Sequence, residues 1–372
     1  MKPEWKATPS GKLRGKGLGL PFEGVSGPFN AITDVPGVTV GYSTIVTGDG
    51  PLVTGQGPVR TGVTAIVPRP LAEIDQPLFA GFFSLNGNGE LSGTHYIEET
   101  GKMALPITIT NTHSCGIARD ATIRWAVEFL AERYHDDFAL PVAAETYDGF
   151  LNDINGFHVE ARHVAQAIDA AQGGAIEEGS VGGGTGMKCF GFKAGSGTSS
   201  RLVDYGGEAF TVGVFVQANF GTRRHLTVLG YTIGADPDLP PMLTNTKDTE
   251  LSSIIAIIAT DAPFLPHQLK RLARRATFGI GKTGGMATHG SGDLFLAFST
   301  AASDLGAGAI RTVRFVPDED IDPFFEAVVQ ATEEAILNSM IANEGMTGRD
   351  RNFVPALPHE AVKRALGLTV QK

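Results

Sequence analysis

The residues best suited to chemistry stand where a polar stretch of the chain meets a strongly apolar one. Ser253 follows the segment TNTKDTEL (244–251) and Ser252, and it opens the run SIIAIIATDAP. If the chain were cut just before Ser253, this residue would carry a free α-amine beside its hydroxyl. An α-amine has a pKa of about 7.7–8.0, so at neutral pH it can act as the base for that hydroxyl. Serines also begin strands for capping reasons, and the residues alone leave both interpretations open.

Other reactive motifs fit less well. In the segment GGGTGMK (182–188), Met187 separates the last glycine from Lys188, and Cys189 stands where a phosphate-binding loop needs Ser or Thr. A glycine turn that permits close packing is the better interpretation. The nine histidines form no H-E-x-x-H pattern, and the chain has no G-x-S-x-G sequence. We therefore expect neither a metal centre nor an α/β-hydrolase site.

The elements that would position Ser253 are strands alternating with helices. The run IIAIIA after Ser253 predicts a strand buried on both faces, although its period alone does not exclude a buried helix segment. Strands are predicted at 38–40, 61–67, 210–219, 253–263 and 294–299, and helices at 120–133 (with Asp120 as N-cap), 159–171, 266–275 and within 322–342. Strands in a buried sheet with helices outside it indicate a layered α/β domain.

Length and charge limit the organisation of the chain. Its 372 residues would suit two domains or one large α/β domain, and no change of composition marks a linker. Residues 1–20 interleave basic residues with Gly, Pro and Ser, which predicts a flexible basic arm before a single catalytic domain at 21–372. A net charge of −10 without a basic stripe argues against nucleic acid as a partner. The one dense basic cluster is expected to be a solvated helix face and comprises Lys270, Arg271, Arg274 and Arg275.

Composition also bears on the compartment. No uninterrupted apolar stretch reaches the roughly 18 residues of a transmembrane helix, so no membrane partner is expected, and no secretory signal is visible. The two cysteines, Cys115 and Cys189, are too few for a disulfide framework, which favours a reducing, cytoplasmic location. The 48 glycines imply many tight turns and close backbone approaches.

Longer blocks of sequence carry a resemblance to a known family. SIIAIIATDAPFLPHQLKRLARR and SGDLFLAFST stand in the C-terminal third of the chain. The preceding blocks are GLPFEGVSGPFNAITDVPGVTVGYSTI, NGNGELSG, PITITNTHSCGIARDA, AETYDGFLNDING, VGGGTGMKCFGFKAGSGTSSR and VGVFVQANFG. Together they resemble the self-processing DmpA-type aminopeptidases (L-aminopeptidase/D-amidase-esterase and β-peptidyl aminopeptidases) of peptidase family S58. The resemblance covers essentially all of the chain after the basic arm. It implies a four-layer αββα sandwich with an Ntn-hydrolase-like arrangement, similar to that of DmpA and ornithine acetyltransferase.

The resemblance also implies self-cleavage. In that family the precursor cuts itself immediately before a serine, which then becomes the nucleophile. The matching position is Ser253, so we expect an α chain of residues 1–252 and a β chain of residues 253–372. Ser252 is the rival nucleophile. Family members commonly have Gly or Asn before the nucleophile, where this chain has Ser252.

Five further residues match functional positions of the family. Asn219 matches the oxyanion-stabilising asparagine, and Tyr147 matches a tyrosine whose hydroxyl donates near the nucleophile. Ser291 and Asp293 match a serine–acid pair around the nucleophile, where some members have Glu in place of Asp. Glu145 matches the acidic residue that binds the substrate's ammonium. Taken singly, each could serve packing or capping instead.

The resemblance thus implies a serine aminopeptidase that releases N-terminal residues from short peptides, aminoacyl amides or esters through an acyl-enzyme on Ser253. It also implies a homotetramer of αβ units with no metal or organic cofactor. Two alternatives stay open at this point. One is an acyltransferase of the ornithine acetyltransferase kind, and the other is an unprocessed homologue that binds a small amine-bearing ligand.

Overall fold

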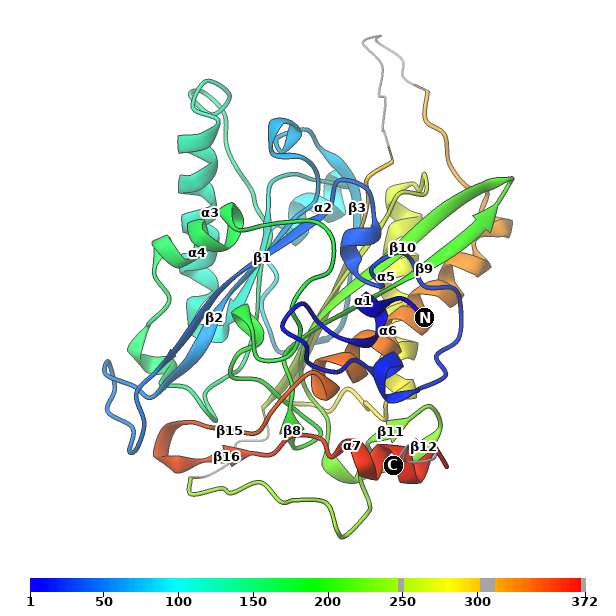
Figure 1. Cartoon of the computed structure of the whole chain (residues 1–372). Coiled ribbons are helices and arrows are strands. Elements are labelled where there is room, and N and C mark those ends of the chain that lie inside the picture. Colours follow the sequence, from blue (N-terminus) through cyan, green and yellow to red (C-terminus); the bar gives the residue numbers. More distant parts are fainter. Residues whose placement is uncertain (247–250, 302–311, 369–372) are drawn as a thin grey trace.

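Two β-sheets lie face to face at the centre of the computed structural model, which describes residues 1–246, 251–301 and 312–368 (Figure 1). The larger sheet has the order β4 (Lys102–Met103), β3 (Leu78–Gly87), β14 (Ser291–Ser299), β13 (Ser252–Thr260), β10 (Glu208–Asn219) and β9 (Ser196–Tyr205). The smaller sheet has the order β1 (Thr39–Thr47), β2 (Val59–Val67), β5 (Ile107–Asn111) and β6 (Ala143–Thr146). Within the larger sheet, β13 runs parallel to β14 and antiparallel to β10.

Helices cover the outer face of each sheet. The smaller sheet packs against α3 (Cys115–Phe129) and α4 (Ala161–Asp169), and the larger one against α5 (Pro266–Lys282) and α6 (Asp322–Ile341). The remaining elements are α1 (Pro3–Lys6), α2 (Thr94–Thr100), α7 (His359–Ala365) and three short hairpins, β7 (Lys188–Cys189) with β8 (Phe192–Lys193), β11 (Thr227–Val228) with β12 (Tyr231–Thr232), and β15 (Met346–Thr347) with β16 (Phe353–Val354). The four-layer αββα sandwich expected from the sequence is confirmed.

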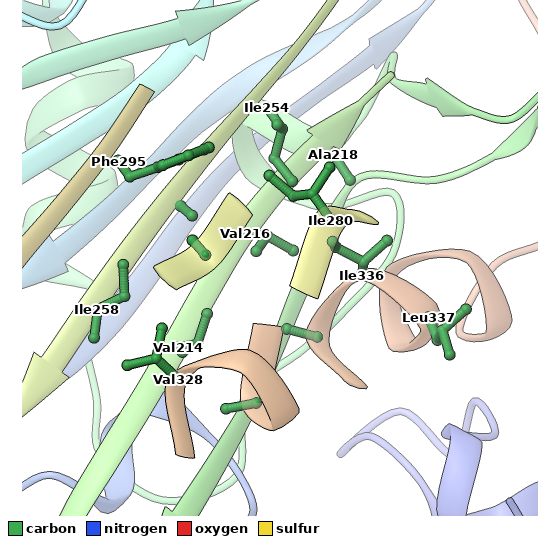
Figure 2. Packing of buried hydrophobic residues seen from close by; sticks show 14 of the residues in the cluster. Val214, Val216, Ala218, Ile254, Ile258, Ile280, Phe295, Val328, Ile336 and Leu337 are labelled. Atoms are coloured by element: carbon green, nitrogen blue, oxygen red, sulfur yellow. The ribbon is translucent and has the colours of Figure 1, made fainter. Parts of the chain in front are cut away.

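Strand β13 is the part of the core that explains the isoleucine run. Ile254 and Ile258 point toward α5 and α6, where they pack with residues such as Val216 and Ile336 (Figure 2). Ile255 and the other alternate residues point toward the smaller sheet and belong to the core between the two sheets. Because side chains alternate along a strand, a residue run that is apolar at every position fills both cores at once. Ser253 therefore lies at the start of a strand that is packed on both faces.

Two predicted helices have different ends in the structure. Helix α3 begins at Cys115 rather than after Asp120, because a 3₁₀ turn leads directly into it and the Asn111 side chain accepts a hydrogen bond from the Ser114 N–H. Helix α5 continues past Arg275 to Lys282 through a glycine-containing turn. Gly279 lets α5 approach α6 closely, since a Cβ there would lie 2.5 Å from Cβ of Thr332. Tertiary packing thus outweighs the low helix propensity of glycine.

The first 20 residues differ from the expected flexible arm, because the structure packs them against the larger sheet and α6. Arg14 Nε donates to Glu178 Oε2 at 2.6 Å, and both side chains are buried. The Gly15 N–H donates to Asn338 Oδ1 in α6, and Leu18 and Leu20 join the core beneath the helices. The basic residues in this segment therefore include one that holds it to the fold. No helix in the described part of the chain is both long and apolar enough to cross a bilayer.

Candidate active site

Ser253 lies between the ends of two neighbouring strands that also carry predicted site residues. Its register partner on β10 is Asn219, and its partner on β14 is Gly292. Directly paired residues on neighbouring strands project from the same face, so the Ser253 and Asn219 side chains lie side by side on the face that looks toward the smaller sheet. The Ser253 hydroxyl donates to the carbonyl oxygen of Ser252 at 2.6 Å. The predicted nucleophile thus touches the peptide group that it is expected to attack.

Asn219 presents an open donor beside this hydroxyl. Its Oδ1 accepts the backbone N–H of Lys188 at 3.0 Å, and this bond leaves the Nδ2 end of the amide pointing elsewhere. Nδ2 is buried and has no hydrogen-bond partner among the described residues. Leaving a buried donor unpaired costs about 1–3 kcal/mol, so such a group calls for an explanation. One explanation is that this donor is held in place for a negative charge that forms only during the reaction.

Ser291 and Asp293 form the predicted serine–acid pair. Ser291 Oγ donates to Asp293 Oδ1 at 2.7 Å, and both residues are buried. Burial raises the pKa of Asp293 to about 6, although hydrogen bonds from Ser291, the Asn86 amide and the Ile254 N–H partly oppose this. Asp293 Oδ2 nevertheless has no partner of good geometry among the described residues.

The Ser291 and Asp293 side chains lie on the face of the larger sheet that is opposite the Ser253 side chain. Asp293 is the register partner of Ile254, which points toward α5, and Ser291 is the partner of Ser252. Strand alternation therefore puts the pair on the helix-covered face, where Ser252, Ser291 and Asp293 line one narrow cavity. The pair adjoins the peptide that joins Ser252 to Ser253, on the side opposite the Ser253 side chain.

Glu145 lies at the end of β6, close to the same strand ends. Its Oε1 accepts the backbone N–H of Glu90 at 2.9 Å, and its Oε2 accepts the hydroxyl of Thr112. Burial raises the pKa of Glu145, and these two hydrogen bonds partly oppose the rise. Gly89 separates the carboxylate from β14: a Cβ at Gly89 would lie 3.0 Å from Glu145 Oε1 and 3.4 Å from Cα of Gly292. Glu145 is thus separated from the strand beside Ser253 by one glycine.

Sequence and structure comparisons agree on one family. Residues 30–354 match peptidase family S58. The chain belongs to this family. It is 46% identical to the β-peptidyl aminopeptidase BapA of Sphingosinicella microcystinivorans over 367 residues, which cover 95% of this chain and 91% of that protein.

Solved structures of S58-like enzymes share the fold. The L-aminopeptidase/D-Ala-esterase/amidase of Ochrobactrum anthropi is described as a prototype of the serine aminopeptidases and a variant of the Ntn hydrolase fold. It superposes with a TM-score of 0.88 at 47% identity, over 95% of this chain and 98% of its own. A Burkholderia sp. β-aminopeptidase superposes with a TM-score of 0.86 at 42% identity, over 97% of this chain and 100% of its own. The Ntn-hydrolase arrangement of this S58 chain is therefore confirmed, and the chain is a serine aminopeptidase by family.

Tyr147 lies near the other predicted site residues but is not hydrogen-bonded to Ser253 within the described residues. The residue is half-buried and follows Thr146, whose hydroxyl accepts a hydrogen bond from Gln217 Nε2 at 2.8 Å. Its ring lies over Gly149, where a Cβ would be 2.4 Å from the tyrosine hydroxyl. Within the described residues, no hydrogen bond joins that hydroxyl to Ser253. The structure thus places Tyr147 next to a strand of the site, and its donor role stays a prediction.

A cavity of about 530 Å³ opens beside Ser252, the residue before the predicted nucleophile. It is lined by Asn219 and Ser252, by Lys188 and Arg223, and by the segment that leads toward the predicted cleavage position. The glycine turn at 182–184 packs closely against the sheets, as the sequence predicted, since a Cβ at Gly183 would lie 2.3 Å from Gln217 Oε1.

Sequence reasoning missed several groups around this site. Asp148, next to Tyr147, is fully buried, and burial raises its pKa to about 7. The fully buried Lys193 was also missed, as were the backbone N–H groups of Glu90 and Lys188, which fix Glu145 and Asn219. Residue type cannot reveal a backbone donor. For the two buried charged residues, the only signal was their position inside the family blocks.

Proposed function

We propose that the protein is a self-processing N-terminal-serine aminopeptidase that releases N-terminal residues from short peptides, aminoacyl amides or esters. The observation that carries this proposal is the contact of the Ser253 hydroxyl with the Ser252 carbonyl, beside the unpaired Asn219 amide. A hydroxyl in contact with the carbonyl and a donor for the resulting oxyanion both promote attack on that bond.

Self-cleavage would begin with the attack of Ser253 Oγ on the carbonyl carbon of Ser252. The C–N bond then breaks, its nitrogen takes the hydroxyl proton, and an ester joins Ser252 to Ser253 Oγ. Water hydrolyses this ester, which leaves a carboxylate on Ser252 and a free α-amine on Ser253. The products are the α chain 1–252 and the β chain 253–372.

The mature enzyme would use the same hydroxyl a second time. The α-amine of Ser253 takes the hydroxyl proton as Oγ attacks the substrate's acyl carbon, and Asn219 Nδ2 donates to the oxyanion. We assign Tyr147 as a second donor to that charge. Ser291 and Asp293, on the other side of the cleaved peptide, would hold the α-amine. The leaving amine takes the proton, and water then hydrolyses the acyl-enzyme.

Glu145 would restrict the enzyme to free N-termini. Each of its oxygens already accepts one hydrogen bond and retains a lone pair for a substrate ammonium. The similar proteins named above act on β-peptides, L-aminoacyl groups or D-Ala esters and amides according to their names. We propose substrates of this class, with a short acyl group and a free α- or β-amine. Hydrolysis rather than transfer to an amine acceptor separates this activity from that of the acyltransferase alternative.

The cleavage itself provides the test. Purified protein should give two bands on a denaturing gel, and N-terminal sequencing of the smaller band should begin at Ser253. Ser253→Ala should give one band and no turnover of aminoacyl p-nitroanilides, because one hydroxyl serves both steps. Ser252→Ala is the matched control and should be cleaved and active. One intact wild-type band that is unchanged by incubation would refute the proposal and favour the unprocessed ligand-binding alternative.

We also propose that the αβ units assemble into a homotetramer in a reducing, cytoplasmic compartment. Strand β3 supports the assembly. Leu78 and Phe79 pair with β4, and the Ala80 N–H donates to the Gly101 carbonyl at 2.9 Å, but from Gly81 onward β3 pairs with no strand on that side within the described sheet. Both cysteines are buried and free, which fits a reducing environment. Light scattering of the cleaved protein would test the assembly, and a mass of one αβ unit would contradict it.

A further inference from the structure

Lys193 is a buried basic residue that the proposed mechanism does not use. It stands at the end of β8 and is 0% exposed. Its Nζ donates to the carbonyl oxygens of Met187, at 2.8 Å, and Ala194, at 2.6 Å. In the described part of the chain, no carboxylate forms an ion pair with it. Burial without a counter-ion lowers the pKa of Lys193 well below its ordinary value and costs several kcal/mol on general grounds. A residue retained at such a cost needs a reason.

The contact with Met187 connects Lys193 to the oxyanion site. The Met187 carbonyl and the Lys188 N–H belong to the same peptide group. That N–H is the donor that holds Asn219 Oδ1 at 3.0 Å. The ammonium therefore acts on one end of a peptide whose other end fixes the Asn219 amide. Because hydrogen bonds in series polarise one another, a donor on the carbonyl strengthens the N–H of the same peptide as a donor.

We propose that Lys193 is a positioning residue of the oxyanion site, which acts through the 187–188 peptide to hold Asn219 with its Nδ2 turned toward the carbonyl under attack. The inference rests on the proposed function, since it assigns Asn219 the role of oxyanion donor. A rotated amide would place Nδ2 against the Lys188 N–H, donor facing donor, and Oδ1 against the developing negative charge. The fixed peptide excludes that arrangement before the reaction begins.

The surrounding loop shows why a lysine suits this place. Between β7 and β8 the chain turns through Phe190 and Gly191, both with positive φ. Lys193 Nζ bridges the carbonyls on the two sides of this turn, and the Met187 carbonyl also accepts the Ala194 N–H at 3.2 Å. One long side chain with three donors can hold both strands from inside, where no water is needed to satisfy the carbonyls.

The test is a double-variant cycle on the processed enzyme. Lys193→Met keeps the length of the side chain and removes the ammonium. It should lower kcat on an aminoacyl p-nitroanilide about tenfold or more, with KM changed less than twofold, because misplacing a transition-state donor affects mainly the chemical step. Asn219→Ala should lower kcat by about 100- to 1000-fold. In the Asn219→Ala background, Lys193→Met should then cause no further loss.

The controls separate positioning from general stability. Lys16→Met removes another largely buried ammonium, in the N-terminal segment, and should leave kcat unchanged. Rates are normalised to the amount of cleaved β chain, so slower self-cleavage does not imitate slower turnover. If Lys193→Met does not accumulate as folded protein, Lys193→Gln, which keeps an amide donor, replaces it in the cycle.

Each outcome decides a different point. Equal losses from the lysine substitution with and without Asn219 would overturn the positioning role, as would unchanged kcat in the single variant. Wild-type protein that is neither cleaved nor active would overturn the proposed function, and this inference with it. Active wild-type enzyme with an unaffected Lys193 variant overturns the inference alone.

Discussion

Asp293 should reduce the stability of the uncleaved protein, and the reduction should depend on pH. Burial raises the pKa of this carboxyl from 3.8 to about 6. Each pKa unit corresponds to about 1.4 kcal/mol, so at neutral pH the folded chain bears a cost of about 3 kcal/mol for holding this carboxylate charged. Asp293→Asn removes the charge while its amide oxygen can still accept the Ser291 hydroxyl.

Folding becomes less favourable as the pH rises, because the unfolded chain releases the proton of this carboxyl at a lower pH than the folded chain. Below about pH 4 the carboxyl is protonated in both the folded and the unfolded chain, and the cost is absent. Between pH 4 and pH 6 the unfolded chain ionises while the folded chain stays protonated, so folding becomes less favourable as the pH rises. Above pH 6 the cost is constant. The Asn variant should therefore gain about 2 kcal/mol over the aspartate form between pH 4.5 and pH 7.5.

The assay is urea denaturation at these two pH values. Both proteins carry Ser253→Ala, so that each is a single uncleaved chain. Any mismatch of the new amide with the Asn86 amide and the Ile254 N–H is the same at both pH values and cancels in the comparison. Asp204→Asn, at an exposed position of β9, is the control for removing one carboxylate. A difference in unfolding free energy between Asp293 and Asn that does not change with pH would refute the reasoning.

Three further predictions concern other parts of the fold. Glu145→Gln should raise KM for free-amine substrates about tenfold or more, since a charge-assisted bond is lost. The wild-type KM should rise toward acid pH, because burial raises the pKa of Glu145. An equally pH-sensitive KM in the variant would contradict the role of Glu145. Gly292→Ala would place a Cβ 2.3 Å from the Asn88 carbonyl oxygen and should block self-cleavage on a gel, whereas Gly290→Ala, with open space around it, should be cleaved normally. Arg14→Met leaves a buried carboxylate unpaired and should cost about 3–5 kcal/mol in urea unfolding; a loss below 1 kcal/mol would mean that residues 1–20 do not hold to the fold.

The sequence was most informative where composition and period together favour one element. The run after Ser253 fits a strand between two cores, and that strand is observed. The site residues stood in recognisable blocks, but their meeting depends on strand register. Asn219 faces Ser253 only because β10 and β13 pair as they do. A shift of one residue would turn Asn219 to the other face, and nothing local in the sequence sets that register.

Features missed by the sequence depend on partners that are distant along the chain. Arg14 looked like part of a solvated arm because its partner, Glu178, lies 164 residues later. The continuation of α5 from Arg275 to Lys282 was not predicted, because the close approach of Gly279 to Thr332 arises from tertiary packing. No sequence pattern marked Lys193 as buried, because its acceptors are backbone carbonyls, which every residue has. Residue type is read directly from the sequence, whereas the burial of a residue depends on partners that are distant along the chain.

The strand order of the larger sheet also determines what happens to the protein once it is cut. A break before Ser253 would leave β13 and β14 on the smaller fragment, inserted between β3 and β10 of the larger one. The two fragments would then be joined by hydrogen-bonded ladders along both sides of that pair, and neither could leave without exposing two open sheet edges. Dilution should not separate them. After denaturation, however, refolding becomes a bimolecular search, and its yield should depend on concentration. The precursor would fold as a single chain, whereas the separated α and β chains could regain the native fold only by associating with each other.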